Sequence, residues 1–391
     1  MSTLSPDGEP KRLKMSSNNF HDLQSYIKFL DRIGDLKTIE SEVDPNLEIT
    51  EICSRTIEEG GPALLFKNVN GSKYPLVANL FGTKERMELS LGCNPKELGQ
   101  QILEFAQKIV PPKLSTIYDS LPFIKRGLNL RSKTISINAM SQQIDGNEDL
   151  DSLPILKCWP EDGGKFITMG LTITQSPLTN KRNMGMYRLQ KHDNKTLGMH
   201  WHPHKGGAAH YYESCNLGKD LPVSIVLGGD PSLIFCSIAP LPENIDEVLF
   251  SAFLKNKPID LVKSKNSDIM VPANAEFIIE GIVPQDKTKL EGPFGDHFGY
   301  YSMEANFPYL NIKTITRKID PIFPATVVGR PPKEDMFLGD AATDIFGPLI
   351  KLVNPEVLDL WAYYEAGFHN LLVVSVDERY PKNSVKAMMS I

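Results

Sequence analysis

The sequence lacks the features that mark several large classes of protein. It has no run of about eighteen apolar residues, so no segment is expected to span a membrane. It has no long block of lysine or arginine, and 48 acidic residues outnumber 42 basic ones, so nucleic acid is not expected as a partner. Cysteine is scarce and forms no C-x-x-C pair, which argues against a disulfide framework or a structural zinc site and favours a reducing, cytoplasmic compartment. The five cysteines are Cys53, Cys93, Cys158, Cys215 and Cys236.

The chain is long enough for two or three domains, since it has 391 residues. Residues 1–18 are polar and lack the apolar core of a secretory signal, and we expect a disordered tail. Changes in composition then divide the chain into an N-terminal α/β domain at 19–125, a barrel-like domain at 126–320, and the start of a C-terminal α/β domain at 321–391.

Local patterns predict the elements of the first domain. Apolar residues recur at helical spacing from His21 to Leu36, and Gly34 can end that helix. A second helix is expected to begin with Asp44 as N-cap and Pro45 in its first turn. Two strands are expected on either side of Asn70-Gly71-Ser72.

From Phe166 onward the pattern changes to short strand-like runs joined by polar turns. Sequential short strands favour an antiparallel barrel or sandwich. One amphipathic helix, "ENIDEVLFSAFLKN", interrupts them. Further on, a helix is expected from Phe346 and a strand at "NLLVVSV".

Five of the eight histidines lie between His192 and His210, most of them in "GMHWHPHKGGAAH". On a strand, alternation would place His200, His202 and His204 on one face, where imidazoles can bind a metal. Pro203 can break this alternation, and exposed histidines on a polar strand are common, so both interpretations stay open.

Two further clusters carry chemistry. A helix beginning at Gly206, directly after Lys205, would present backbone N–H groups and a positive charge to an anion, although an ordinary Gly-Gly turn fits equally well. Glu291 and Asp296 are separated by Gly292, Pro293 and Gly295, and a turn there can bring the two carboxylates together for acid–base work. Two solvated loop acids are the alternative.

Taken together, these stretches resemble the UbiD family of decarboxylases, from about His21 to the end of the chain. The segments that carry the resemblance are "VDPNLEITEI", "GGPALLFKN", "NLFGT", "CWPEDGG", "RNMGMYR", "HKGGA", "EGPFGDHFGYY" and "GRPP". The resemblance implies an α+β fold in which an N-terminal α/β domain, a central split β-barrel and a C-terminal α/β domain follow one another. It also implies prenylated FMN as cofactor, with a divalent cation, usually manganese and here manganese or magnesium, and often potassium.

The resemblance assigns roles residue by residue. It implies that the metal ligands are Asn183, His204 and Glu247. The cofactor-binding residues that it implies are Met186, Tyr187, Arg188, His200, Trp201, His202, Lys205 and Gly206. The catalytic residues that it implies are Asp296 as proton donor, with Glu291 and Arg188 in one coupled network. Periodicity alone would make Glu247 a solvated glutamate, because it lies off the apolar face of its helix.

Within this family, the chain resembles in particular the bacterial 3-polyprenyl-4-hydroxybenzoate decarboxylases of ubiquinone biosynthesis. The resemblance therefore implies decarboxylation of that acid, a flavin prenyltransferase as cofactor supplier, a homo-oligomer, and a cytoplasmic enzyme with peripheral contact at the inner membrane left open. A naphthoate, hydroxybenzoate or cinnamate substrate is the first alternative, and a zinc hydrolase built on the histidines is another. The family continues beyond the last residue of this chain, which leaves a non-catalytic flavin-binding fragment as a third. Histidine at position 200 also departs from the arginine of enterobacterial relatives.

Overall fold

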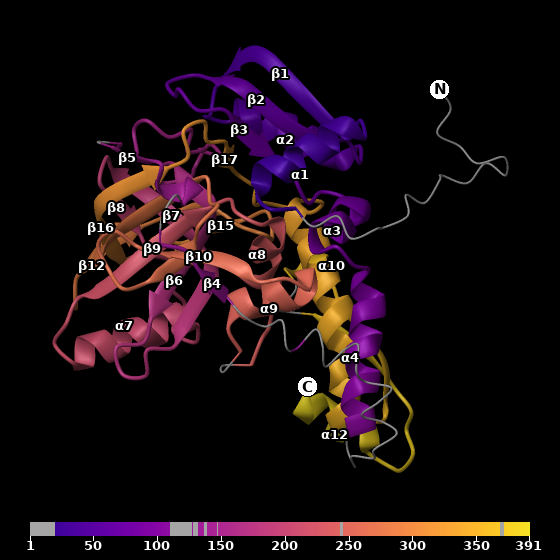
Figure 1. Cartoon of the computed structure of the whole chain (residues 1–391). Coiled ribbons are helices and arrows are strands. Elements are labelled where there is room, and N and C mark those ends of the chain that lie inside the picture. Colours follow the sequence, from indigo (N-terminus) through magenta and orange to yellow (C-terminus); the bar gives the residue numbers. More distant parts are fainter. Residues whose placement is uncertain are drawn as a thin grey trace.

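The computed structural model describes residues 20–109, 127, 132–136, 139–146, 148–242, 245–367 and 371–391. The tail expected at 1–18 lies outside the described residues. An N-terminal layer sits on top of a β-barrel, and a helical arm extends away from both (Figure 1). No helix among the described residues is both long and apolar enough to cross a bilayer.

The N-terminal layer is a four-stranded sheet with helices packed against it. Its elements are α1 (Leu23–Arg32), β1 (Leu36–Val43), α2 (Glu48–Glu58), β2 (Ala63–Val69), β3 (Leu76–Ala78), α3 (Lys84–Leu91) and α4 (Pro95–Ile109). The strand order is β1-β2-β3-β17, and β17 (Phe323–Pro324) comes from the far end of the barrel segment. The N-terminal sheet is therefore completed by residues that lie more than two hundred positions later in the chain.

Helix starts follow local capping chemistry, and one expectation is wrong here. Asp22 caps α1, and its side chain accepts a hydrogen bond from the backbone N–H of Ser25. The second helix begins at Glu48 instead of just after Asp44. The Asp44 carboxylate accepts from the backbone N–H of Asn46, so it closes a turn before the helix and leaves the helix start uncapped by a side chain.

The barrel is a ring of six strands. They are β6 (Phe166–Gln175), β7 (Arg182–Asp193), β8 (Thr196–Gly198), β9 (Leu221–Leu227), β12 (Phe277–Val283) and β16 (Ala305–Arg317). The order β12-β9-β6-β7-β8-β16 is closed by antiparallel pairing of β12 with β16. The expected α+β fold with a central barrel is thus confirmed, including the paired strands β2 and β3 around Gly71.

The side chains of the barrel strands point alternately into two different apolar clusters. Val226 and Ile278 join one cluster, which also holds residues of α1, α8 (Pro231–Cys236) and α9 (Glu247–Lys255). Their neighbours Ile225 and Phe277 join the other. Because successive side chains point to opposite faces, each of these strands is buried on both sides and reads as a continuous apolar run.

Shorter elements surround the barrel. They are β4 (Ser132–Thr134), η1 (Met140–Gln142), β5 (Ile144–Gly146), α7 (Gly206–Asn216), β10 (Ile259–Lys263), β11 (Met270–Pro272), β13 (Thr288–Glu291), β14 (Phe294–Gly295) and β15 (Tyr301–Ser302). Strand β13 extends the sheet beside β16, and β14 pairs with β15 in a separate two-stranded ladder.

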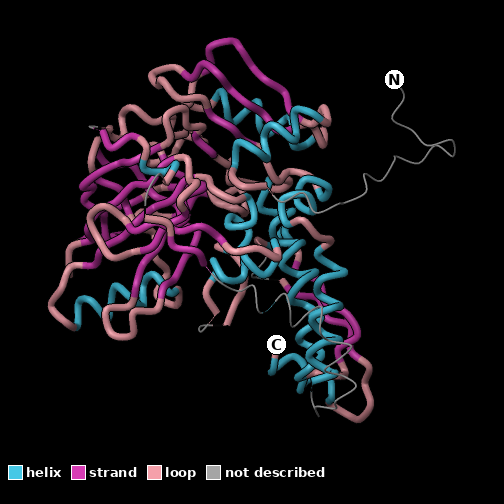
Figure 2. Tube along the Cα trace, in the orientation of Figure 1, coloured by secondary structure: helices cyan, strands magenta, loops and turns pink. Residues whose placement is uncertain are grey.

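The C-terminal arm is built around α10 (Glu334–Phe346), which runs alongside α4 (Figure 1, Figure 2). Its remaining elements are η2 (Gly347–Leu349), α11 (Ile350–Val353), β18 (Val357–Ala362), η3 (Tyr364–Ala366), β19 (Leu372–Val376) and α12 (Asn383–Ser390). Helical structure does follow Phe346, as expected, in η2 and α11, whereas the longer helix α10 before it was not expected. The strand expected at "NLLVVSV" is confirmed as β19, which pairs with β18.

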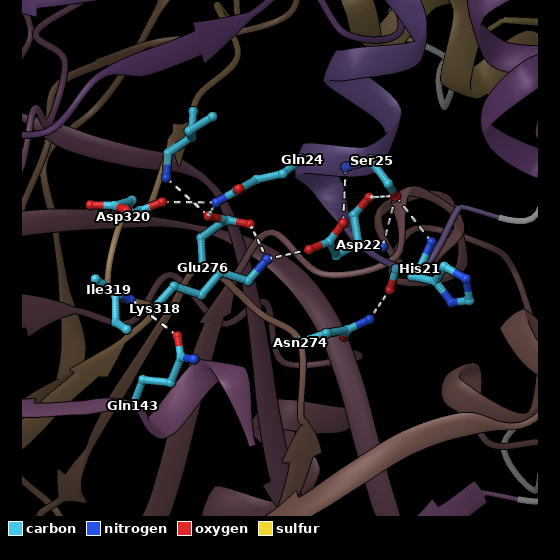
Figure 3. Close-up of polar contacts among 11 residues, drawn as sticks. His21, Asp22, Gln24, Ser25, Gln143, Asn274, Glu276, Lys318, Ile319 and Asp320 are labelled. Atoms are coloured by element: carbon cyan, nitrogen blue, oxygen red, sulfur yellow. Dashed lines mark hydrogen bonds and ion pairs between the residues drawn. The ribbon is translucent and has the colours of Figure 1, made fainter. Parts of the chain in front are cut away.

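A buried charge network fixes α1 on the barrel (Figure 3). Lys318, just after β16, donates to Glu276 Oε1 at 2.7 Å and also to Asp22, the cap of α1. Gln24 of α1 and the backbone N–H of Ile322 donate to Glu276 Oε2 at 2.8 and 2.9 Å. The Glu276 side chain is fully buried. Burial raises the pKa of Glu276, and the charge of Lys318 opposes this shift.

Candidate active site

Three charged side chains from different parts of the barrel meet at one place. Arg188 on β7 donates from Nε to Glu291 Oε1 (3.0 Å) and from Nη1 to Asp296 Oδ2 (3.1 Å). Its Nη2 donates to Ser302 Oγ (3.1 Å), and the guanidinium lies 4.7 Å from the centre of the Phe294 ring. The Glu291 side chain is fully buried, whereas that of Asp296 is 31% exposed. The structure therefore joins the three predicted catalytic residues, and Asp296 is the carboxylate that reaches the surface.

The turn between the two carboxylates is fixed by the strand that carries the arginine. Gln190 lies two residues after Arg188 and therefore on the same face of β7. Its Oε1 accepts from the backbone N–H of Gly292 (2.9 Å), and its Nε2 donates to the carbonyl of Gly163 (2.9 Å). Gly292 has φ of +101°, which strains any other residue, and a Cβ on Gly163 would lie 1.9 Å from the Gly292 carbonyl oxygen. Both glycines of this close approach are thus required by the geometry.

The segment "CWPEDGG" supports the same turn from the other side. Asp162 Oδ1 accepts from the backbone N–H of Gly295 (2.8 Å), and its Oδ2 accepts from those of Trp159 (2.8 Å) and Cys158 (3.1 Å). A Cβ on Gly295 would lie 2.1 Å from Trp159 Cδ1. This segment therefore holds the residues before Asp296 in place.

The histidine segment is a loop, so the interpretation as a strand, which the sequence left open, does not hold. Strand β8 ends at Gly198, so His200, His202 and His204 do not share a strand face. His200 is half-buried, and its Nδ1 lies 2.8 Å from Glu291 Oε1, which places it in the Arg188 network. His202 and His204 are exposed, with their rings stacked at 5.7 Å. Pro203 and the turn closed from Trp201 N–H to the Met199 carbonyl break the alternation.

A polar cradle lies at the start of α7, so of the two alternatives at Gly206 the structure shows the helix and not a simple Gly-Gly turn. A Cβ on Gly206 would lie 2.1 Å from Asn183 Oδ1, so the asparagine of β7 touches the first residue of the helix. The backbone N–H of Gly207 faces the Tyr187 hydroxyl (3.4 Å), and a Cβ there would lie 2.8 Å from Trp201 Nε1. The N-terminal N–H groups of a helix attract anions.

The cradle and the carboxylate network adjoin through two pairs of consecutive residues. Tyr187 and Trp201 face the cradle, and their rings meet edge to face at 6.5 Å. Arg188, which follows Tyr187, and His200, which precedes Trp201, both contact Glu291. A single ligand could therefore present an anionic end to α7 and a reactive end to Asp296.

The metal ligands implied by the resemblance fall into two groups. Glu247 is the first residue of α9, and its Oε2 accepts from the backbone N–H of Met184 (3.0 Å), next to Asn183. Burial raises the pKa of Glu247 to about 7, although the hydrogen bonds from its own backbone N–H and from that of Met184 lower it. Within the described part of the chain, no hydrogen bond joins His204 to Asn183 or Glu247, and no group of three or more His, Cys, Asp and Glu could hold a metal.

Met186, Tyr187 and Arg188 cannot all point their side chains at one cavity. On β7 they alternate, so Tyr187 shares a face with Asn183, and Met186 shares the opposite face with Arg188. The backbone N–H groups of Met184 and Met186 donate to Glu247 and to the Ser237 carbonyl (3.3 Å) and not to β6. These two backbone N–H groups of the strand are therefore already satisfied within the protein.

The donor set fits a flavin phosphate with a hard cation beside it. Asn183 Nδ2 and Trp201 Nε1 are buried and have no hydrogen-bond partner among the described residues, as is also true of Glu291 Oε2. Buried donors without acceptors are costly, and phosphate oxygens would satisfy them. The carboxylate of Glu247 and the amide oxygen of Asn183 suit manganese or magnesium. Lys205, which directly precedes α7, adds a positive charge.

Sequence reasoning missed several partners of the network. Ser302 and Phe294 contact Arg188, and both lie within or beside a quoted motif, so spacing could have drawn attention to them. Asp335 on α10 contacts His297, next to Asp296. No local pattern marks Asp335, because α10 itself was not expected there.

Three family models match the chain, one for each part of the fold. They are described as the Rift-related domain (residues 133–331), the N-terminal domain (27–106) and the C-terminal domain (336–391) of 3-octaprenyl-4-hydroxybenzoate carboxy-lyase. An uncharacterized protein of Aquifex aeolicus is 40% identical over 377 residues, which cover 95% of this chain and 78% of that protein. One from Chlamydia trachomatis is 42% identical over 373 residues, covering 94% of this chain and 64% of its own length.

Solved structures share the fold. The UbiD-class enzyme HmfF of Pelotomaculum thermopropionicum, in an evolved dimeric form in complex with prenylated FMN, superimposes with a TM-score of 0.81 at 23% identity, over 95% of this chain and 82% of that one. Vanillic acid decarboxylase of Sedimentibacter hydroxybenzoicus superimposes with a TM-score of 0.81 at 26% identity. The match covers 95% of this chain and 77% of that one. With models matched along its length and relatives at 40% identity, the chain belongs to the UbiD family and is a carboxy-lyase of its aromatic acid decarboxylase class.

Proposed function

We propose that the chain decarboxylates 4-hydroxy-3-polyprenylbenzoate in ubiquinone biosynthesis, with prenylated FMN and manganese or magnesium as cofactors. The observation that carries the proposal is the pair of contacts from Arg188 to Glu291 and Asp296, beside a cradle with unsatisfied buried donors. The description of the matching family models and the prenylated FMN in HmfF support the substrate class and the cofactor.

When bound, the prenylated flavin supplies the electron sink that loss of CO₂ from an aromatic acid requires. The phosphate would lie against Lys205, Gly206 and the backbone of α7, with Tyr187 and Trp201 forming the adjoining wall. Asn183 and Glu247 would hold the cation, with His204, or His200 or His202 in its place, as third ligand. Met186 would add a further contact from the same strand.

The chain's own residues orient the acid and move a proton. Arg188 presents a guanidinium fork that holds the substrate carboxylate or stays paired with Glu291. Glu291 keeps the arginine and His200 in place from its buried position. Asp296 donates a proton to the ring carbon that has lost CO₂, and its partial exposure lets solvent return that proton.

The test is expression of the full chain together with a flavin prenyltransferase. The visible spectrum and the mass of the released cofactor should identify prenylated FMN, and metal analysis should find manganese or magnesium, with potassium and zinc measured alongside. The protein should release CO₂ from 4-hydroxy-3-octaprenylbenzoate. Stoichiometric zinc without flavin would support a hydrolase instead, and bound cofactor without CO₂ from any aromatic acid would support a non-catalytic flavin protein.

A different aromatic acid is the second candidate. Vanillic acid decarboxylase, at 26% identity, shares this fold over 95% of the chain. The same assay with vanillate, 3,4-dihydroxybenzoate, a naphthoate and cinnamate decides between them. Turnover of one of these acids, with none of the polyprenylated acid, would remove the role in ubiquinone synthesis and keep the decarboxylase.

Assembly and location complete the proposal. Large apolar side chains are exposed on β18, β19 and α12, which supports a homo-oligomer formed through the C-terminal arm; they are Leu358, Trp361, Leu372, Val373, Met388 and Met389. All five cysteines are free, which fits the cytoplasm. Light scattering tests the oligomer, and sedimentation with vesicles tests peripheral contact with the inner membrane.

A further inference from the structure

Two adjacent carboxylates in the first turn of α10 reach toward different parts of the molecule. Glu334 is buried, and its Oε1 and Oε2 accept from the backbone N–H groups of Phe81 (2.9 Å) and Asn79 (3.2 Å) in the "NLFGT" segment of the N-terminal layer. Asp335, the next residue, makes a short contact from Oδ2 to Nδ1 of His297. The start of α10 is therefore fixed to the N-terminal layer on one side and to the barrel on the other.

His297 lies between Asp335 and Asp296. Its Nδ1 faces Asp335, while its Nε2 lies 3.6 Å from Asp296 Oδ1. The same Asp296 oxygen accepts from the backbone N–H of His297 at 2.8 Å, and the other oxygen accepts from Arg188. The imidazole thus connects a carboxylate of the C-terminal arm to the carboxylate assigned as proton donor.

The charges that face His297 come from three elements. Asp335 lies on α10, Asp296 on the loop of His297 itself, and Arg188 on β7. Burial lowers the pKa of His297, but the hydrogen bond and charge of Asp335, with the charge of Asp296, outweigh burial and Arg188 and raise it above its ordinary value. The protonated imidazole therefore persists to higher pH than that of a free histidine.

The protonation state of His297 decides whether an N–H or a lone pair faces the Asp296 carboxylate. A protonated His297 has an N–H at Nε2, directed at the Asp296 carboxylate. A neutral His297 that keeps its proton on Nδ1, toward Asp335, presents a lone pair to Asp296 instead. Only the first form attracts an ionised Asp296 and holds it beside Arg188 between turnovers.

We propose that Asp335 is a positioning residue for the decarboxylation, acting through His297 to hold Asp296 in its place beside Arg188. The proposal rests on the role of Asp296 as proton donor given above. The position of Asp296 then also depends on the C-terminal arm. Asp335 keeps its place only while Glu334 holds the start of α10 against the N-terminal layer.

The test uses the holoenzyme and the Asp335→Asn variant, which keeps the shape of the side chain and removes its charge. The kcat of the variant should fall about tenfold, with KM and flavin content unchanged. The alkaline fall in kcat should begin at lower pH, because His297 loses its proton earlier without the Asp335 charge. The matched control is Asp340→Asn on the same helix, whose carboxylate faces Asp344 and Lys84 and should leave both kcat and the pH profile unchanged.

A second readout needs no turnover. Histidine ring resonances followed by NMR against pH, with the His297 signal assigned by its loss in His297→Gln, should show a lower titration midpoint in Asp335→Asn and also in Asp296→Asn. An unshifted His297 midpoint in Asp335→Asn overturns the proposal, as does a variant with wild-type kcat and pH profile. Full activity of Asp296→Asn would instead overturn the assignment of the proton donor, so the two failures are distinguishable.

Discussion

Glu247, the first residue of α9, accepts a hydrogen bond at 3.0 Å from the backbone N–H of Met184 on β7. This contact connects residues 63 positions apart and brings an acid to the backbone N–H of the residue that follows Asn183. One carboxylate oxygen is used in this way, and burial raises the pKa of the group to about 7. A buried carboxylate with a raised pKa is a group from which a divalent cation can displace a proton.

Replacing Glu247 with glutamine should remove the metal. The amide keeps the size of the side chain but lacks the negative charge, so manganese affinity should fall at least tenfold, as measured by titration of metal-free protein and by metal content. Glu304→Gln, at an exposed position, is the matched control and should bind metal normally. Normal manganese binding by Glu247→Gln would show that the cation lies elsewhere.

Asp296→Asn should separate cofactor binding from chemistry. The variant keeps the Arg188 contact through its amide oxygen but cannot give a proton, so kcat should fall by about 10² to 10⁴, while flavin content stays at the wild-type level. CO₂ release and flavin absorbance measure the two effects. Asp268→Asn, whose side chain is 87% exposed, controls for the substitution itself. An Asp296→Asn enzyme with normal turnover would contradict the assignment.

Periodicity and turn chemistry predicted the elements that depend on local sequence. The strands around Gly71 were predicted, because glycine positions and alternating apolar residues report local geometry. For the segment at Gly206 and for Glu291 and Asp296, the sequence left a simple turn and two solvated acids as alternatives, and the structure shows a helix and two acids that share Arg188. Whether His200–His204 form a strand was left open by the sequence, and the turn at Trp201 shows that they do not.

Contacts between distant segments were not visible in the same way. Glu247 looked like a solvated residue from its helical position, and only the family resemblance suggested its role. The pairing of β17 with β3 and the contact of Asp335 with His297 depend on how separate domains pack. A single sequence carries no local signal for such packing, since each partner is an ordinary residue in its own segment.

Lys318→Met should destabilise the junction of α1 with the barrel. The variant leaves Glu276 fully buried without its cation, which costs about 3–5 kcal/mol of unfolding free energy. Burial already raises the pKa of Glu276, and losing Lys318 raises it further. A group whose pKa is raised on folding favours the folded state while it is protonated, so the stability of the variant should fall as pH rises through that pKa.

Chemical denaturation at several pH values measures this loss. Lys263→Met is the control, since Lys263 pairs with Asp268 in solvent and its loss should change the midpoint little. Equal midpoints for the two variants at neutral pH would show that the buried network contributes no more than a surface pair.

Gly206→Ala should weaken flavin binding through the asparagine beside it. The added Cβ would lie 2.1 Å from Asn183 Oδ1, so the asparagine must turn away from the start of α7 and the cradle loses a donor. We expect at least a tenfold loss of affinity for FMN, measured by fluorescence titration of apoprotein, with little change in thermal stability because α7 gains a better helix former. Gly146→Ala adds the same methyl group where the nearest atom is 3.6 Å away and should bind FMN normally. If both variants bind FMN equally well, the phosphate does not lie at the start of α7, and the cradle assigned to Asn183, Trp201 and Gly206 is wrong.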